Sequence, residues 1–143
     1  MPESESLKGR LLVASPALFD PNFRRSVVLV TEHEAEGAMG LVLSRPAPAT
    51  VAEAAPSLEP LVEPDAVVHV GGPVQPEAVL VLAEFEAPED SAGLVLGDVG
   101  FVRGDFDPAL AATSIRRARV FAGYAGWSAG QLEAELEEPS WLV

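Results

Sequence analysis

Cysteine is absent from this chain of 143 residues, and its absence removes several classes of chemistry at once. Disulfides, thiolate metal sites and thiol nucleophiles all require it. Long apolar runs are also missing, since none approaches the roughly 18 residues of a membrane-spanning helix. The acidic start, MPESESLKGR, lacks the basic and then apolar layout of a signal peptide. We therefore expect a cytoplasmic protein that contacts no membrane and carries no cofactor.

Basic residues are scarce, with 9 lysines and arginines against 22 acidic residues and a net charge of −13. Such a surface repels phosphate backbones, because nonspecific nucleic-acid affinity comes from neutralised phosphates. No helix-turn-helix with a basic second helix is visible. The main basic concentration is Arg116, Arg117 and Arg119, to which Arg24 and Arg25 could add. We expect these arginines to pair with the surplus carboxylates, and the charge disfavours direct nucleic-acid binding.

Apolar residues make up 48% of the chain, which is typical of one globular domain over residues 1–143. Short apolar and β-branched runs predict strands. These lie at 11–15, 26–33, 41–46, 66–74, 78–85 and 117–126, with one or two more within 93–105. The runs at 26–33 and 41–46, joined by a short glycine-containing turn, predict an antiparallel hairpin.

Helical signals are few. Prolines at 56, 60 and 64 limit the segment 49–65 to short helical turns. Asp107 and Pro108 are typical of a helix start and predict a short helix over 107–114. Strict alternation of strand and helix is missing, which counts against a doubly wound parallel sheet. The pattern predicts a mixed, largely antiparallel α+β fold with a few short helices.

Residues 126–130 spell G-x-S-x-G around Ser128, the nucleophile-elbow pattern of α/β-hydrolases. In that order, an acid and then a histidine follow the serine. Here the only histidines, His33 and His69, lie far upstream. A convergent triad can use another chain order, so a hydrolase using Ser128 remains one alternative.

A helix start explains more of these residues. Ser128 and Gln131 form the S-x-x-Q of a capping box, in which each side chain satisfies the other's backbone N–H. Trp127 and Leu132 then stand at the positions of a hydrophobic staple. The following glutamates should face mostly outward. We interpret Ser128 as the N-cap of the last helix.

Two further constellations could bind ligands. Glu32, His33, Glu34 and Glu36 cluster where a strand meets a turn, and with His69 they could form a two-histidine, one-carboxylate metal site. Their spacing matches no metal motif, so a solvated strand end is favoured and no metal is expected. His33 and Glu32 could also act as an acid–base pair.

The glycine pair Gly71-Gly72 before Pro73 could bring backbone N–H groups to an anion, but it lacks the P-loop and dinucleotide patterns, so a tight turn is favoured. Tyr124, Gly126 and Trp127 could line a ligand cleft with aromatic stacking surface. The competing interpretation is glycine-permitted packing of a strand against a helix.

Four stretches taken together resemble the YqgE/AlgH family of bacterial proteins. They are residues 9–46, which contain DPNFRRSVV and EHEAEGAMGLV; VHVGGPV at 68–74; RVFAGYAGWSAGQLEAEL at 119–136; and SWLV at 140–143. As an ordered set these motifs are highly specific. The resemblance implies a curved, partly barrel-like sheet flanked by helices. Family chains usually run some dozens of residues past the WL motif, so we expect the family's C-terminal segment to be missing here.

The resemblance implies little about chemistry, since members are labelled transcriptional regulators without an established activity. We expect a non-enzymatic, regulatory module that binds a protein or small molecule. A DNA-binding transcriptional regulator is the alternative. The positions that match the family's motifs and are expected to form the ligand or partner surface are Asp20, Pro21, Phe23, Glu32, His33, Gly71, Gly72, Tyr124, Gly126 and Trp127.

Overall fold

The computed structural model describes residues 6–14, 26–102, 113–137 and 141–143. The strands are β1 (Leu11–Ala14), β2 (Val27–Glu34), β3 (Gly37–Val42), β4 (Pro46–Thr50), β5 (Val67–Val70), β6 (Val74–Phe85), β7 (Gly93–Leu96), β8 (Val99–Phe101), β9 (Ile115–Ser128) and β10 (Trp141–Leu142). The helices are α1 (Val51–Ala54) and α3 (Gln131–Glu137), with short 3₁₀ turns η1 (Pro56–Leu61) and η2 (Pro88–Asp90).

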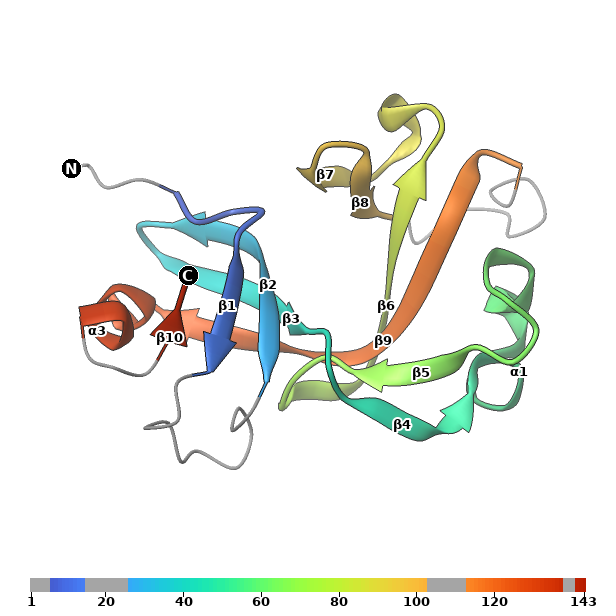
Figure 1. Ribbon diagram of the computed structural model, residues 1–143, viewed down its shortest axis with the longest axis horizontal. Helices are drawn as coiled ribbons and strands as arrows, with labels where there is room; N and C mark the ends of the chain where they lie inside the picture. Colours follow the sequence, from blue (N-terminus) through green and yellow to red (C-terminus); the bar gives the residue numbers. More distant parts are fainter. Residues whose placement is uncertain (1–5, 15–25, 103–112, 138–140) are drawn as a thin grey trace.

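The strands form a curled sheet in the order β10-β1-β2-β3-β9-β6-β8-β7, and a β4–β5 pair joins it through β9. Every described pairing is antiparallel except that of β5 with β9, which is parallel. The result is a half-barrel with a few short helices (Figure 1). The predicted mixed, largely antiparallel α+β fold is confirmed.

Strand β9 holds the two ends of the molecule together. Its last residues pair with β3, from Ala125 to Ser128, and its earlier residues pair with β6 on one side and β5 on the other. Figure 1 shows β9 running from the β6 region to the β1–β3 end near α3. This 14-residue strand carries alanines and aromatic residues in its second half, and Val120, Phe121, Ala125 and Trp127 are buried there.

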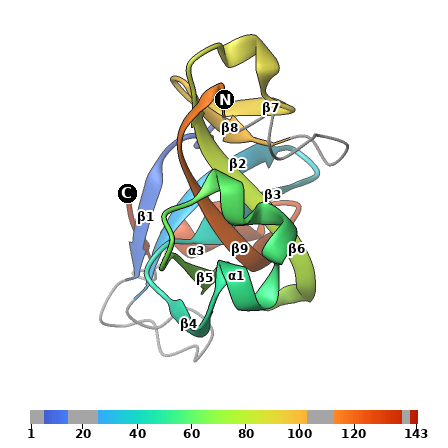
Figure 2. The same cartoon turned by 90° about the vertical axis from the view of Figure 1, so that its right-hand side faces the viewer.

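Two hydrophobic cores lie along β9. The first packs α3 and β10 onto β1–β3, and its buried members are Leu12, Val28, Val30, Val42, Ala125, Trp127, Leu132 and Trp141. The second lies under α1 and η1, which Figure 2 shows in front of β5 and β9. Its buried members are Val51, Leu58, Leu61, Val68, Val81 and Val120. Burying one such side chain stabilises the fold by about 1.5–3 kcal/mol.

Glycines allow the backbone to cross β9. After β5 the chain passes from one side of β9 to the other, where β6 begins. A Cβ on Gly71 would overlap the Gly123 carbonyl, and a Cβ on Gly72 would overlap the Tyr124 carbonyl group. Gly123 itself has a φ of +76°, which favours glycine. Gly71 and Gly72, for which a tight turn was favoured, therefore allow a contact of backbone on backbone.

Most predicted strands are confirmed, including the antiparallel hairpin of β2 with β3. The second hairpin strand was misplaced, because β3 occupies residues 37–42 instead of 41–46. Strand β4 was missed, since prolines at 46 and 48 argued for a break. Among the described strands β4 pairs only with β5, and such an edge tolerates the missing proline N–H. The predicted helix over 107–114 lies mostly outside the described residues.

Among the described residues, no helix combines the length and the apolar character needed to span a membrane.

The crossing makes a stability prediction. Gly72→Ala should destabilise the protein by about 3 kcal/mol or more, because the new methyl group meets backbone that cannot move aside. The control is Gly93→Ala, where an added Cβ meets nothing within 4 Å. Urea unfolding monitored by circular dichroism measures both variants. Equal stability of the two variants would contradict the crossing as described.

Candidate functional site

A β-bulge in β2 decides which way the candidate side chains point. The register with β3 shifts between Val30 and Glu32, so Thr31 is the extra residue. Thr31 is 1% exposed, and its hydroxyl donates to the Met39 carbonyl at 3.2 Å. A shift of one residue reverses the alternation of faces. His33 consequently joins Val28 and Val30 on the side of the first core.

His33 is the most constrained of the predicted site residues, with a side chain 5% exposed. Its Nδ1 accepts from the Leu7 N–H at 2.9 Å, and its Nε2 lies 3.0 Å from Oε2 of Glu133 on α3. Because Nδ1 accepts, the proton sits on Nε2, which donates to Glu133. The Glu133 backbone N–H and the His33 hydrogen bond lower the pKa of the Glu133 carboxyl. The ring therefore ties the chain start and α3 to β2.

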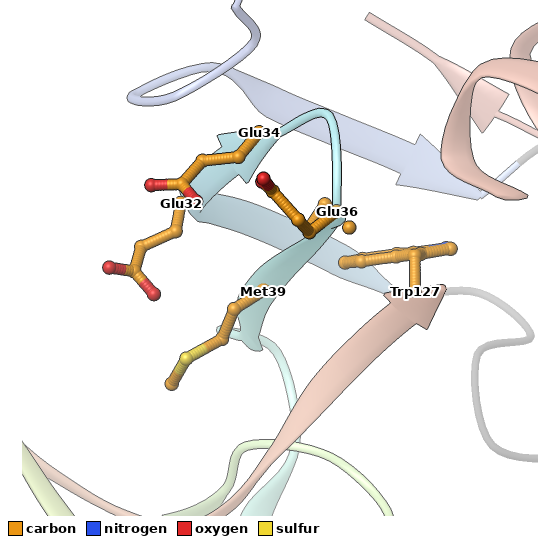
Figure 3. A pocket seen from close by; sticks show the side chains of 7 residues that line it. Glu32, Glu34, Glu36, Met39 and Trp127 are labelled. Atoms are coloured by element: carbon orange, nitrogen blue, oxygen red, sulfur yellow. The ribbon is translucent and has the colours of Figure 1, made fainter. Parts of the chain in front are cut away.

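An acidic hollow of about 280 Å³ lies at the end of the β2–β3 hairpin, where Glu32 and Met39 face away from His33. The name refers to its lining residues Glu32, Glu34, Glu36, Gly37, Ala38, Met39 and Trp127. Figure 3 shows the labelled glutamates along the hairpin with Met39 below them, and the Trp127 ring apart from them at the end of β9. All three glutamates are exposed. The hollow thus combines the negative charge of the glutamates with the apolar surface of Met39.

Trp127 offers little surface for stacking, because it is only 5% exposed. Its ring packs edge-on against Trp141, with centroids 6.3 Å apart. Both indole N–H groups donate to the same oxygen of Glu135, at 3.0 Å and 2.9 Å, and Gln131 donates to the other oxygen at 3.1 Å. Trp127, Trp141 and Glu135 thus form an anchor that fastens α3 and β10 to β9.

Ser128 ends β9, while α3 begins at Gln131 after Gly130, whose φ is +76°. The Ser128 N–H donates to Oε1 of Gln131 at 2.9 Å, which is one half of the expected capping box. The Ser128 hydroxyl donates to that same oxygen at 3.2 Å. The first helical bond runs from the Ala134 N–H to the Gly130 carbonyl, so Gly130 stands at the N-cap position that was expected for Ser128.

The other glycine and aromatic motif residues lie on β9 or in the link that crosses it. Gly71 and Gly72 cross over Gly123 and Tyr124, so their backbone is packed and does not form an open turn around an anion. Gly126 is exposed and pairs with Met39, beside the acidic hollow. The structure therefore brings Glu32, Gly126 and Trp127 close together and places the glycine pair at the adjoining crossing.

The second histidine is not part of this site. His69 lies on β5, beside the Phe121 ring at 5.9 Å. Burial and the Arg119 charge lower the pKa of His69, against a smaller opposing effect of the Val67 backbone. No group of three potential ligands for a metal occurs in the described part of the chain. The two-histidine metal hypothesis therefore receives no support from the placement of His69.

The arginines are engaged as expected from the charge balance. Arg116 approaches Asp98 at 3.5 Å, Glu86 at 3.8 Å and Glu84 at 4.0 Å, and Arg117 lies 3.4 Å from Glu84. Arg119 donates to the Leu43 carbonyl at 3.3 Å. The expected site residues Asp20, Pro21 and Phe23, like Arg24 and Arg25, lie outside the described residues.

Sequence reasoning missed Leu7, Glu133 and Glu135. The last two were expected to face solvent, but they bind His33 and the two indoles. A signal existed for Glu135, which lies three residues after Leu132 and four after Gln131, next to the buried stripe of α3. Leu7 contributes its backbone N–H, and a backbone contact of this kind leaves no pattern in the side chains of the sequence.

Removal of the Glu135 carboxylate should lower the stability of the protein. Glu135→Ala should destabilise the protein by about 2 kcal/mol, because hydrogen bonds to a carboxylate from both indoles are removed together. Tryptophan emission should change as well, since Trp127 and Trp141 are the only tryptophans. The control is Glu137→Ala on the exposed end of α3, which should stay within about 0.5 kcal/mol of the wild type. Similar melting curves and emission for both variants would rule out the anchor.

Comparison with known proteins identifies the family. The family described as DUF179, AlgH-like, matches residues 11–143. A UPF0301 protein from Streptomyces avermitilis is 46% identical, with all of this chain and 77% of the relative aligned. A Corynebacterium diphtheriae crystal structure superposes with a TM-score of 0.88 at 27% identity, over 97% of this chain and 75% of the other. The solution structure of AlgH from Pseudomonas aeruginosa superposes with a TM-score of 0.75 at 38% identity, over 99% of this chain and 79% of the other. The chain belongs to the AlgH-like UPF0301 family.

Proposed function

We propose that the chain is a single-domain, non-enzymatic cytoplasmic module that binds a basic segment of a partner protein in the acidic hollow, and that it regulates the partner through this contact. The observation that carries the proposal is the hollow itself. Three exposed glutamates surround it, and the half-buried Met39 supplies apolar surface. A lysine or arginine side chain matches both features, because its stem is apolar and its head is cationic.

The size of the hollow favours a side chain of a partner over an enclosed ligand. Its volume of about 280 Å³ lies just below the range of roughly 300–1,000 Å³ that is usual for small-molecule pockets. It also lies beside a hairpin turn on the surface, where a peptide segment has access. A protein partner is therefore preferred to a small molecule.

The hydrogen bonds that the candidate catalytic groups already make support a binding role over catalysis. The His33 Nε2 that a triad would need donates to Glu133, and the Ser128 hydroxyl donates to Gln131. These interactions hold the end of β9 and the start of α3 in place. Both groups thus have structural duties that explain their positions without catalysis.

Charge supports a protein partner over DNA as well. Arg116 and Arg117 already face carboxylates, so their charge is largely compensated. The hollow is negative and would repel phosphate. A regulatory effect exerted through a protein contact fits this distribution better than one exerted by reading a DNA groove.

The proposal is tested with a short peptide rich in lysine and arginine, titrated against the full chain by calorimetry. Changing Glu32, Glu34 and Glu36 together to glutamine should weaken binding about tenfold, because each exposed charge pair contributes up to about 1 kcal/mol. The matched control changes Glu59, Glu63 and Asp65 to their amides. These residues are also exposed and alter the net charge equally, but they lie near η1.

Weaker binding in the first variant alone supports the proposal. If both triple variants weaken binding equally, or if the wild type binds the basic peptide no better than a neutral peptide of the same length, the acidic hollow is not the binding site.

A further inference from the structure

Both ring nitrogens of His33 are occupied by groups that lie far away in the sequence. The Leu7 N–H, 26 residues earlier, donates to Nδ1 at 2.9 Å. Glu133, 100 residues later, accepts from Nε2 at 3.0 Å. The side chain is 5% exposed, so water cannot easily replace either partner. The two contacts hold together only while the ring is neutral.

A second proton on the His33 ring would be compatible with the Glu133 contact but not with the Leu7 contact. An imidazolium carries hydrogen on both nitrogens and accepts nothing. Nε2–H would keep its bond to Glu133 and gain the attraction of opposite charges. Nδ1–H would face the Leu7 N–H, so two donors would meet where one hydrogen bond had been. The Leu7 amide would then have to move away from the ring.

Glu133 is the charged side chain that contacts the His33 ring. Glu137, one turn further along α3, and Lys8, next to Leu7, are both exposed. Ala38, the partner of His33 on β3, is uncharged. Glu32 and Glu34 flank His33 on β2 but line the acidic hollow on the opposite face.

We propose that His33 is a pH-sensitive latch that holds the first described residues, 6–8, against β2 and releases them when the ring gains a proton. The segment makes other contacts as well: Leu7 packs against the first core, and the Ser6 hydroxyl reaches the His33 carbonyl at 3.5 Å. The next attachment, from the Gly9 N–H to the Val30 carbonyl at 2.7 Å, does not involve the ring. Release therefore stays local to residues 6–8 and leaves β1 in the sheet.

The latch goes beyond the proposed partner binding and does not depend on it. Histidine is the side chain that ordinarily changes charge between pH 8 and pH 5. Protonation of the His33 ring would free residues 6–8 while α3 stays held by Glu133. The device would couple proton uptake to exposure of the core surface that Leu7 covers.

The test is hydrogen exchange of the Leu7 amide by NMR on the full chain, expressed as a protection factor at each pH. In the wild type, protection should fall about fivefold or more once the nitrogen-15 shifts of the ring show the imidazolium, as one buried hydrogen bond is lost. In His33→Asn, whose side-chain oxygen can accept from Leu7 but cannot be protonated, protection should stay constant. His69→Asn, the control, should behave like the wild type.

A second measurement keeps the proposal testable if a variant folds poorly. Nitrogen-15 shifts of the wild-type His33 ring should show the Nε2–H tautomer at pH 8. The Nδ1–H tautomer there would overturn the latch. So would Leu7 protection that is absent at pH 8, that is unchanged once the ring is an imidazolium, or that falls equally in His33→Asn.

Discussion

The crossing of the backbone over β9 is the constraint on which the rest of the structure depends. Strands β5 and β6 pair with the same residues of β9, Phe121 and Ala122, from opposite sides. The link between them must therefore pass over β9, and only glycine at positions 71 and 72 leaves room for it. Because the crossing fixes β9 in the middle, the strand can carry one core at each end.

The bulge at Thr31 then decides which side chains of β2 face the hollow and which face the first core. One face presents Glu32 and Glu34 to the acidic hollow, and the other presents His33 to Leu7 and α3. The proposed partner contact and the proposed latch thus share a strand without sharing a side chain. The Glu135 anchor completes this end of the molecule, since it holds both Trp127, which lines the hollow, and Trp141 to α3.

Local patterns predicted the strands, the β2–β3 hairpin and the fold class, because alternation and turn residues act over short distances. Strand β4 was lost because its prolines are tolerated only at an edge, which depends on its partner. The face of Glu32 and His33 could not be predicted either, since a single inserted residue reverses it and no composition signal marks Thr31. The roles of Glu133 and Glu135 depend on contacts across the fold, with His33 on β2 and Trp127 on β9.

Binding of a basic segment at the end of the β2–β3 hairpin is tested most directly by chemical-shift mapping. The chain would be titrated with a short lysine- and arginine-rich peptide while the backbone amides and methionine methyl groups are followed by NMR. The account predicts that shifts concentrate at Met39 and the amides of residues 32–39, with little change at residues 59–65. Shifts spread evenly over the acidic surface, or centred away from the hairpin, would contradict it.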